Sequence, residues 1–200
     1  MQIHEALGID ISPYSVGRIL RTHHVNFPTG GGPSWLIFIG NMKDGLWSVD
    51  LFRCEPISQR SHWVMVAMDQ FTRRIIGFSV HVGSCDGIVY CRMFNEIISD
   101  KSLPRYLSSD KDPLFLFHRW KENLQILEIE EIKSVPRNPN SHPFIERIIG
   151  STRRECLDHI LFFNGRDLRN KLNNYRIYYN ENRAHSSLNR KTPTGSQRTR

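Results

Sequence analysis

The 200-residue sequence contains little cysteine and no long hydrophobic run. Its four cysteines (Cys54, Cys85, Cys91 and Cys156) form no CxxC pair, so reduced thiols are expected, not a disulfide framework or a thiolate zinc site. No stretch approaches the roughly 20 apolar residues that a membrane span requires. The first residues lack a basic region followed by an apolar run, so no signal peptide is predicted. These absences predict a cytoplasmic protein without membrane association.

Several well-known catalytic motifs are also absent. The sequence has no GxxxxGK[ST] phosphate loop, no HExxH zinc motif and no GxSxG nucleophile elbow. His23 and His24, together with the scattered cysteines, do not make a paired-His, paired-Cys zinc module. The sequence therefore argues against phosphate-loop nucleotide hydrolases, zinc peptidases of that type and serine hydrolases.

The sequence does carry an excess of positive charge. Lys and Arg total 27 against 20 Asp and Glu, which gives a net charge of +7 and a pI near 9.5. Such a balance favours a polyanionic partner, either nucleic acid or an anionic membrane surface. Without a membrane segment, nucleic acid is the better candidate. A hydrophobic fraction of 39% and a charged fraction of 24% are typical of a globular domain with a real core.

Residues 1–23 are predicted to form one or two short helices. Ser12 fits an N-cap and Pro13 the first helical position, followed by an apolar stripe. This stretch resembles the last helix of a helix-turn-helix, although a plain amphipathic helix is the alternative. Residues 24–40 contain a Gly triplet flanked by prolines, which predicts a linker.

From Leu46 the pattern changes to strands, and a basic tail is predicted at 196–200. Three strands followed by alternating helices and strands indicate a mixed sheet covered by helices. The β-branched and aromatic runs place strands at 46–53, 62–69, 73–81, 105–110 and 124–129. Helical periodicity places helices near 86–99, 114–123, from 144 onward and 166–180.

Three acidic residues stand at positions suited to metal binding. Asp50 lies inside the apolar strand WSVDLF, Asp110 closes the strand RYLSSD, and Glu146 falls in the first turn of a helix. A carboxylate in a hydrophobic strand is costly unless it is paired, and Arg53 or a helix N-terminus is the structural alternative for any one of them. Phosphodiester transesterification uses two metal ions, and Mg²⁺ or Mn²⁺ needs oxygen ligands that converge from separate segments.

The order and spacing of these acids match a known family. Asp110 and Glu146 are separated by 35 intervening residues, and Trp47 precedes Asp50 in its strand. Three further segments fit the same pattern: MDQFTRRIIG, FIERIIGSTRRE and YYNENRAHSSLNRKTP. Over about residues 41–195 the sequence resembles the integrase-type transposases of bacterial insertion sequences, whose fold is that of ribonuclease H and retroviral integrase.

This resemblance implies a fold, an activity and a partner. The fold is α/β, a ribonuclease H-like mixed five-stranded sheet flanked by helices, with a short N-terminal helical remnant. Asp50, Asp110 and Glu146 are implied to be catalytic and to hold two Mg²⁺ (or Mn²⁺) ions. The implied reaction is cleavage and strand transfer of DNA, with transposon ends and target DNA as substrates. A homo-oligomer on DNA in the bacterial cytoplasm, associated with the nucleoid, is the corresponding expectation.

One position departs from the family pattern. Many relatives have Asp-Asn-Gly after the second acidic strand, whereas this chain has Asp110, Lys111 and Asp112. A cation beside a metal site weakens metal binding, and the lost Gly changes the turn. Lys111 has two other possible roles, pointing outward or contacting a phosphate. Asp112 lies beyond the strand end at a shorter interval from Glu146, so Asp110 is the predicted ligand.

Basic residues near the last acid predict contacts with DNA phosphates. On the helix of Glu146, positions 146, 150 and 153 share one face, and Gly150 keeps that face open. Guanidinium groups suit phosphates through their planar fork. The predicted DNA-binding residues are Lys111, Arg147, Arg153, Arg154, Arg183 and His185. For the helix arginines the alternative is a solvated face that pairs with Glu155 and Asp158; for Arg183 and His185 it is capping of a turn.

Two other features are expected to be structural. Asp69 is expected to pair with Arg73 or Arg74 in the turn between the second and third strands. Tyr178 and Tyr179 are expected to pack the last helix on the core and not to stack on bases.

Two further functions remain open from the residues alone. The first is a catalytically inactive DNA-binding remnant of a truncated transposase, or a co-folded subunit, favoured by Lys111 and by the partial N-terminal motif. The second is a simple nuclease of the same fold, which cleaves DNA without joining it.

Overall fold

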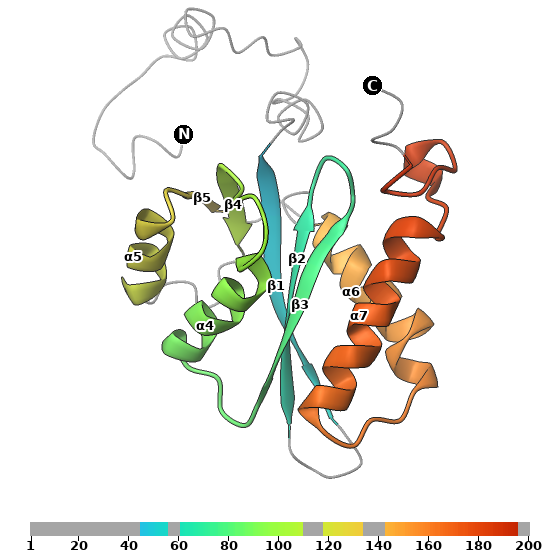
Figure 1. Cartoon of the computed structure of the whole chain (residues 1–200), viewed down its shortest axis with the longest axis horizontal. Coiled ribbons are helices and arrows are strands. Elements are labelled where there is room, and N and C mark those ends of the chain that lie inside the picture. The colour runs from blue at the N-terminus through green and yellow to red at the C-terminus, as the bar shows by residue number, and fades with distance from the viewer. Residues whose placement is uncertain (1–44, 56–60, 110–117, 134–142, 196–200) are drawn as a thin grey trace, which may run out of the picture. The chain divides into compact units, whose positions relative to one another are not determined.

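The computed structural model describes residues 45–55, 61–109, 118–133 and 143–195 of the chain (Figure 1). The predicted N-terminal helices, the linker and the basic tail lie outside these residues and stay predictions. The described strands form one five-stranded mixed sheet in the order β3-β2-β1-β4-β5. Their bounds are Leu46–Cys54 (β1), His62–Asp69 (β2), Ile75–Val82 (β3), Tyr106–Ser109 (β4) and Glu130–Lys133 (β5). Strands β1, β2 and β3 are antiparallel neighbours, whereas β1–β4 and β4–β5 are parallel.

The helices begin at residues suited to cap them. The Asp86 side chain accepts a hydrogen bond from the Val89 amide at 2.8 Å, and Asn164 accepts one from the Asp167 amide at 2.9 Å. The helices are Gly87–Ile98 (α4), His118–Ile126 (α5), Pro143–Glu155 (α6) and Gly165–Glu181 (α7), with 3-10 turns at Leu157–His159 (η2) and Ser186–Leu188 (η3). No described helix is long and apolar enough to cross a bilayer.

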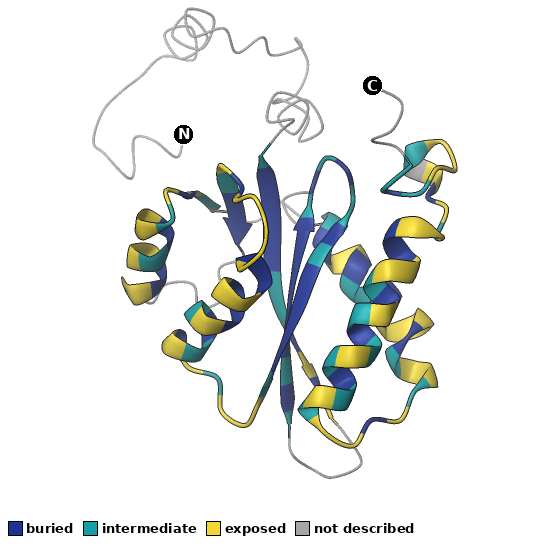
Figure 2. Cartoon of the chain, in the orientation of Figure 1, coloured by how far each residue is buried: buried dark blue, intermediate teal, exposed yellow. Residues whose placement is uncertain are grey.

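Helices cover both faces of the sheet, and each face has its own core (Figure 2). Helices α4 and α5 pack on one face, where Trp120 meets the rings of Tyr90 and Phe94 edge-on at centroid distances of 4.7 and 5.2 Å. Helices α6 and α7 pack on the other face. The mixed, helix-flanked sheet that the sequence predicts is thereby confirmed.

The fifth strand was expected at residues 124–129, and that prediction is wrong. Leu124 belongs to α5, where it shares a buried stripe with Trp120 one turn earlier. The Ile129 amide donates to the Leu124 carbonyl at 2.9 Å, and Glu128 takes a left-handed φ of 56°, so the chain turns before β5 begins at Glu130. A short apolar run has no period that separates a helix end from a strand.

A buried amide fixes the end of α7 to the sheet. Asn180 is 5% exposed, and its side chain accepts from the Ile75 amide and donates to the Ile75 carbonyl, both at 2.9 Å. Its backbone carbonyl also accepts from the Thr194 amide at 3.0 Å. Tyr179 beside it packs in the core as expected, but the same expectation is wrong for Tyr178, which is 49% exposed. Consecutive helical residues point about 100° apart, so both tyrosines cannot face the sheet.

Candidate active site

Asp50 lies in the middle of the central strand. Its Cα partner on β2 is Val66, and its carboxylate accepts a hydrogen bond from the Leu51 amide at 2.7 Å. Trp47 and Val49 of β1 belong to the core under α4 and α5, whereas Phe52 and Cys54 belong to the core under α6 and α7. Because side chains alternate along a strand, Asp50 faces the side of α6 and α7. Its side chain is half-buried.

Strand β4 ends beside the strand that carries Asp50. Ser109, its last residue, is the Cα partner of Val49 on β1. The Ser109 hydroxyl and the Trp120 indole both donate to the Glu131 carboxylate, at 2.6 and 3.1 Å, on the α4–α5 side of the sheet. The two predicted residues that follow in the chain, Asp110 and Lys111, lie outside the described residues.

Glu146 stands exposed in the first turn of α6, where its charge complements the positive end of the helix dipole. Its neighbours Ile145 and Ile148 are buried against the sheet. Near this end of α6, Ile148 lines a cavity with Met68, whose partner on β1 is Ser48. Near the other end, the Arg153 guanidinium lies 5.3 Å from the centre of the Phe52 ring. Helix α6 therefore runs along β1, and its first turn lies at the end nearer Ser48.

Two of the three predicted acids therefore occupy the same face of the sheet. The described residues contain no group of three or more His, Cys, Asp or Glu side chains arranged to hold a metal ion. Asp110 is not among them, so this leaves the predicted trio untested. Carboxylate oxygens are the donors that Mg²⁺ and Mn²⁺ prefer, so Asp50 and Glu146 are suitable ligands by their chemistry.

The predicted DNA-binding residues divide into two groups. Arg153 donates to the Arg53 carbonyl at 3.2 Å and lines a cavity of about 400 Å³ beside the end of β1. A second cavity, of about 420 Å³, is lined by residues from α6, the β2–β3 turn and the segment after α7. Four of the predicted residues line it: Arg147, Arg154, Arg183 and His185. The Arg154 Nη1 atom lies 3.1 Å from where a Cβ on Gly150 would stand, so a larger residue there would push the guanidinium away.

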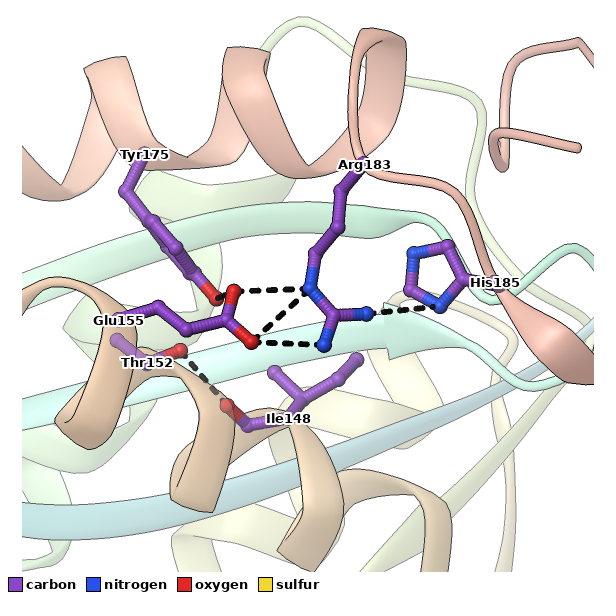
Figure 3. Close-up of polar contacts among 6 residues, drawn as sticks. All are labelled: Ile148, Thr152, Glu155, Tyr175, Arg183 and His185. Carbon is purple, nitrogen blue, oxygen red and sulfur yellow. Dashed lines mark hydrogen bonds and ion pairs between the residues drawn. The ribbon is translucent and has the colours of Figure 1, made fainter. Parts of the chain in front are cut away.

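Arg183 is held by a carboxylate of α6 (Figure 3). Its Nε and Nη2 atoms donate to Glu155 at 2.8 and 2.7 Å, and its Nη1 atom lies 3.3 Å from His185 Nδ1. The Tyr175 hydroxyl donates to the same carboxylate at 3.2 Å. Glu155 thus pairs with Arg183, and the described ion pairs do not join it to the α6 arginines as the alternative interpretation expected.

This network shifts the protonation of its members. The Arg183 hydrogen bonds hold the pKa of Glu155 below its usual value, and the same contact raises the pKa of Arg183. Burial, followed by the Arg183 charge, lowers the pKa of His185, so the ring is neutral at neutral pH. The C-terminal segment is therefore tied to α6 by one negative and one positive charge.

We expect Glu155→Gln to lower the free energy of unfolding at neutral pH and to have little effect in acid. A depressed carboxylate pKa stabilises the fold above the unfolded value of about 4.3, and this contribution is lost as pH falls through the folded pKa. The side chains of Glu155 and Arg183 are 33% and 27% exposed, so their ion pair contributes less than about 1 kcal/mol to the free energy of unfolding. Urea midpoints measured from pH 7 to pH 3 test this. The wild type should converge on Glu155→Gln at low pH, whereas Glu181→Gln, an exposed control on α7, should follow the wild type throughout.

The β2–β3 turn contains Arg73, which was not among the DNA-binding residues predicted from the sequence. Asp69 Oδ1 accepts from the amides of Phe71 and Thr72 at 2.8 and 3.0 Å, so it stabilises the turn through the backbone. Arg73 has a left-handed φ of 63°, and its guanidinium lies 3.1 Å from the centre of the Phe144 ring. Asp69 was expected to pair with Arg73 or Arg74; the described ion pairs include none with Arg73, although the Asp69 charge still acts on it, and pairing with Arg74 stays a prediction. The 71-residue separation of Arg73 and Phe144 hides this contact from sequence patterns.

Comparison with known proteins agrees with this architecture. Residues 127–193 match the family described as "Integrase core domain". The chain is 27% identical over 157 residues to an uncharacterized 39.2 kDa protein of insertion element IS476 from Xanthomonas euvesicatoria. That alignment covers 78% of this chain and 45% of the relative, so the chain spans about half the length of the relative.

Solved structures share the fold at low sequence identity. A chain of the simian T-cell lymphotropic virus intasome, solved with PP2A regulatory subunit B56 gamma, gives a TM-score of 0.63 at 15% identity, covering 78% of this chain and 55% of that one. The HTLV-2 integrase catalytic core domain, solved with magnesium, gives 0.56 at 18% identity, with coverages of 76% and 94%. The catalytic core domain of BIV integrase gives 0.51 at 18%, with coverages of 76% and 91%.

The sheet order and its helices are those of the ribonuclease H-like fold that integrase catalytic cores share. Residues 127–193 match the integrase core domain family, and the chain is similar over most of its length to a protein of a bacterial insertion element, in agreement with the resemblance predicted from the sequence.

Proposed function

We propose that the protein cuts and joins DNA strands as a metal-dependent transposase or integrase. The proposed ligands of two Mg²⁺ (or Mn²⁺) ions are Asp50, Asp110 and Glu146. The observation that carries the proposal is the position of Asp50 at the centre of an integrase-type sheet, facing the helix that carries Glu146. Transposon ends and target DNA are the proposed substrates, and a homo-oligomer on DNA, at the bacterial nucleoid, is the proposed working form.

Strand alternation supports Asp110 as the third ligand. Leu107 and Ser109 of β4 face the α4–α5 side, where Leu107 joins the core and Ser109 contacts Glu131. The next position in the sequence is Asp110. Alternation predicts that a strand continued by one residue returns to the α6–α7 side, the side of Asp50. The parallel pairing of Ser109 with Val49 predicts that this position is level with Asp50.

Different residues of the chain have different roles in the proposed reaction. Asp50, Asp110 and Glu146 would hold two divalent ions, which would supply activation of the attacking oxygen and stabilisation of the leaving one. Asp50 supplies a ligand from a strand that has neighbours on both sides. Glu146 supplies one from the solvent-exposed surface of α6, where DNA has access. Arg153, seven residues further along the same helix face, is positioned to contact the adjoining phosphate backbone.

We expect Mn²⁺ to raise the melting temperature of the protein by a few degrees at millimolar concentration. Binding to the folded state alone stabilises it by RT ln(1 + [L]/Kd), which is about 1.4 kcal/mol at ten times Kd. A domain of this size converts that into roughly 2–6 °C. Asp50→Asn should abolish the shift, and Asp100→Asn, an exposed control beyond α4, should keep it. A wild-type protein that ignores millimolar Mn²⁺ would favour the inactive DNA-binding remnant instead.

A strand-transfer assay separates the proposed function from a simple nuclease of the same fold. A DNA substrate with a pre-cut end supplies the 3′ hydroxyl, so the assay needs no cleavage step. Joining of that end to target DNA supports a transposase or integrase. Cleavage of intact DNA without joining indicates the nuclease.

A further inference from the structure

The cavity of about 420 Å³ is built from three segments that are far apart in the sequence. The β2–β3 turn, helix α6 and the residues after α7 all contribute to its wall, and the network of Figure 3 borders it. Its charged lining residues are Arg73, Arg147, Arg154 and Arg183, and no carboxylate lines it. A concave site with four guanidinium groups attracts an anion.

Three of the four arginines form no ion pair among the described residues. Arg183 is neutralised by Glu155 through two short hydrogen bonds. The described ion pairs include none for Arg73, Arg147 or Arg154. Burial lowers the pKa of Arg73 to about 10; Tyr179 and the Asp69 carboxylate oppose this shift in part, and the nearby Arg147 charge adds to it. A buried cation beside a like charge is costly unless an anion joins them.

Two buried donors also lack partners at this cavity. Arg73 Nη1 is inaccessible to solvent and has no hydrogen-bond partner among the described residues. The same holds for Nε2 of His185, a residue that is 8% exposed. Because Arg183 donates to Nδ1 of the neutral ring, Nε2 carries the proton and is a donor. Buried donors are nearly always satisfied in folded proteins, so Arg73 Nη1 indicates a missing acceptor. The His185 ring is a weaker indication, because the Tyr179 backbone also interacts with it.

The backbone of Arg73 has a conformation that glycine adopts more readily than arginine. Its φ of 63° lies in the left-handed region, where a non-glycine side chain is strained. The side chain is fixed by stacking on Phe144 of α6, which brings the guanidinium from the turn to the cavity. A strained backbone that delivers a charge to a site containing unpaired donors is typical of a binding residue.

We propose that this cavity is a phosphate-binding site that holds one backbone phosphate of a DNA strand. Arg73, Arg147 and Arg154 are the charged donors, and His185 Nε2 adds a neutral one. The identification of the ligand as DNA rests on the proposed function, whereas recognition of the phosphate group rests on the cavity itself. The site lies on the flank of α6 beside Glu146, which does not line it, so the phosphate is bound without a metal ion.

The test uses inorganic phosphate and DNA separately, with EDTA present throughout. At constant ionic strength, inorganic phosphate should raise the melting temperature of the wild-type protein relative to chloride. In the DNA arm, fluorescence anisotropy of a duplex oligonucleotide gives the slope of log K against log [salt]. Loss of one phosphate contact should reduce that slope by about 0.9. In Arg73→Gln and in Arg147→Gln, phosphate should no longer raise the melting temperature, and the salt slope should be smaller by about 0.9. The Arg147 side chain is exposed, so this variant is expected to fold.

The matched control is Arg92→Gln, an exposed arginine of α4 on the other face of the sheet, which should behave as wild type in both arms. An unchanged phosphate response in Arg147→Gln overturns the site. A lost phosphate response with an unchanged DNA slope overturns the DNA assignment and leaves a site for free phosphate. Failure of the catalytic proposal is distinguishable, since it would show as missing Mn²⁺ stabilisation while both metal-free responses persist.

Discussion

Strand transfer should fall by a factor on the order of 10³ or more when Glu146 is replaced by Gln. The substitution keeps the shape of the side chain and removes the charge that binds a divalent ion. Glu146 is exposed, so the fold should not suffer. The measurement is the initial rate of joining a pre-cut end to target DNA in Mg²⁺, with melting temperature and DNA affinity measured on the same preparation.

The control for this prediction is Glu122→Gln, an exposed acid of α5 on the opposite face of the sheet, which should join DNA at the wild-type rate. DNA affinity without metal should stay within about twofold of wild type in both variants, because phosphate contacts dominate binding. Strand transfer that persists in Glu146→Gln would remove this residue from the reaction and end the three-acid assignment.

Unfolding should become easier by about 2–4 kcal/mol when Asn180 is replaced by Ala. The substitution deletes the two hydrogen bonds to the Ile75 amide and carbonyl and leaves both groups buried without partners. The measurement is the urea midpoint at pH 7, with the slope of the transition fitted separately so that a change in stability is recognised as such.

The matched control is Asn174→Ala on the same helix, where the side chain is exposed. It should be neutral or slightly stabilising, because Ala is the better helix former by a few tenths of a kcal/mol. If both variants lose the same stability, the effect belongs to helix α7 in general and not to the amide that joins it to β3.

Much of the sheet could be predicted because its strands have distinct patterns and boundaries. The first three strands and helices α4, α6 and α7 agree with the prediction to within about two residues. The fifth strand failed because LQILEI is apolar without a period, and tertiary contacts of Trp120 and Leu124 decide for a helix. Tyr178 and Tyr179 were treated as a pair, although helix geometry turns them apart.

Sequence motifs identified the candidate acids, whereas the arginine cavity was missed because it is formed by tertiary contacts. Asp50 and Glu146 were selected by their order and the motifs around them, and the structure places both on one side of the sheet; their role as ligands, like that of Asp110, remains a prediction. The grouping of Arg147 and Arg154 with Arg183 and His185 depends on how α7 ends against α6, which no local pattern specifies. Arg73 was predicted only as one of two candidate partners of Asp69, because its contact with Phe144 exists only in the folded chain.

The central position of β1 has a consequence for how the site opens. The backbone of β1 is hydrogen-bonded to β2 on one edge and to β4 on the other, so β1 becomes exposed to solvent only when the sheet unfolds. The first turn of α6 lies at a helix end, where local unfolding costs little free energy. In the proposed site Asp50 would therefore be the rigid ligand and Glu146 the adjustable one, so adaptation to the substrate should come from the helix.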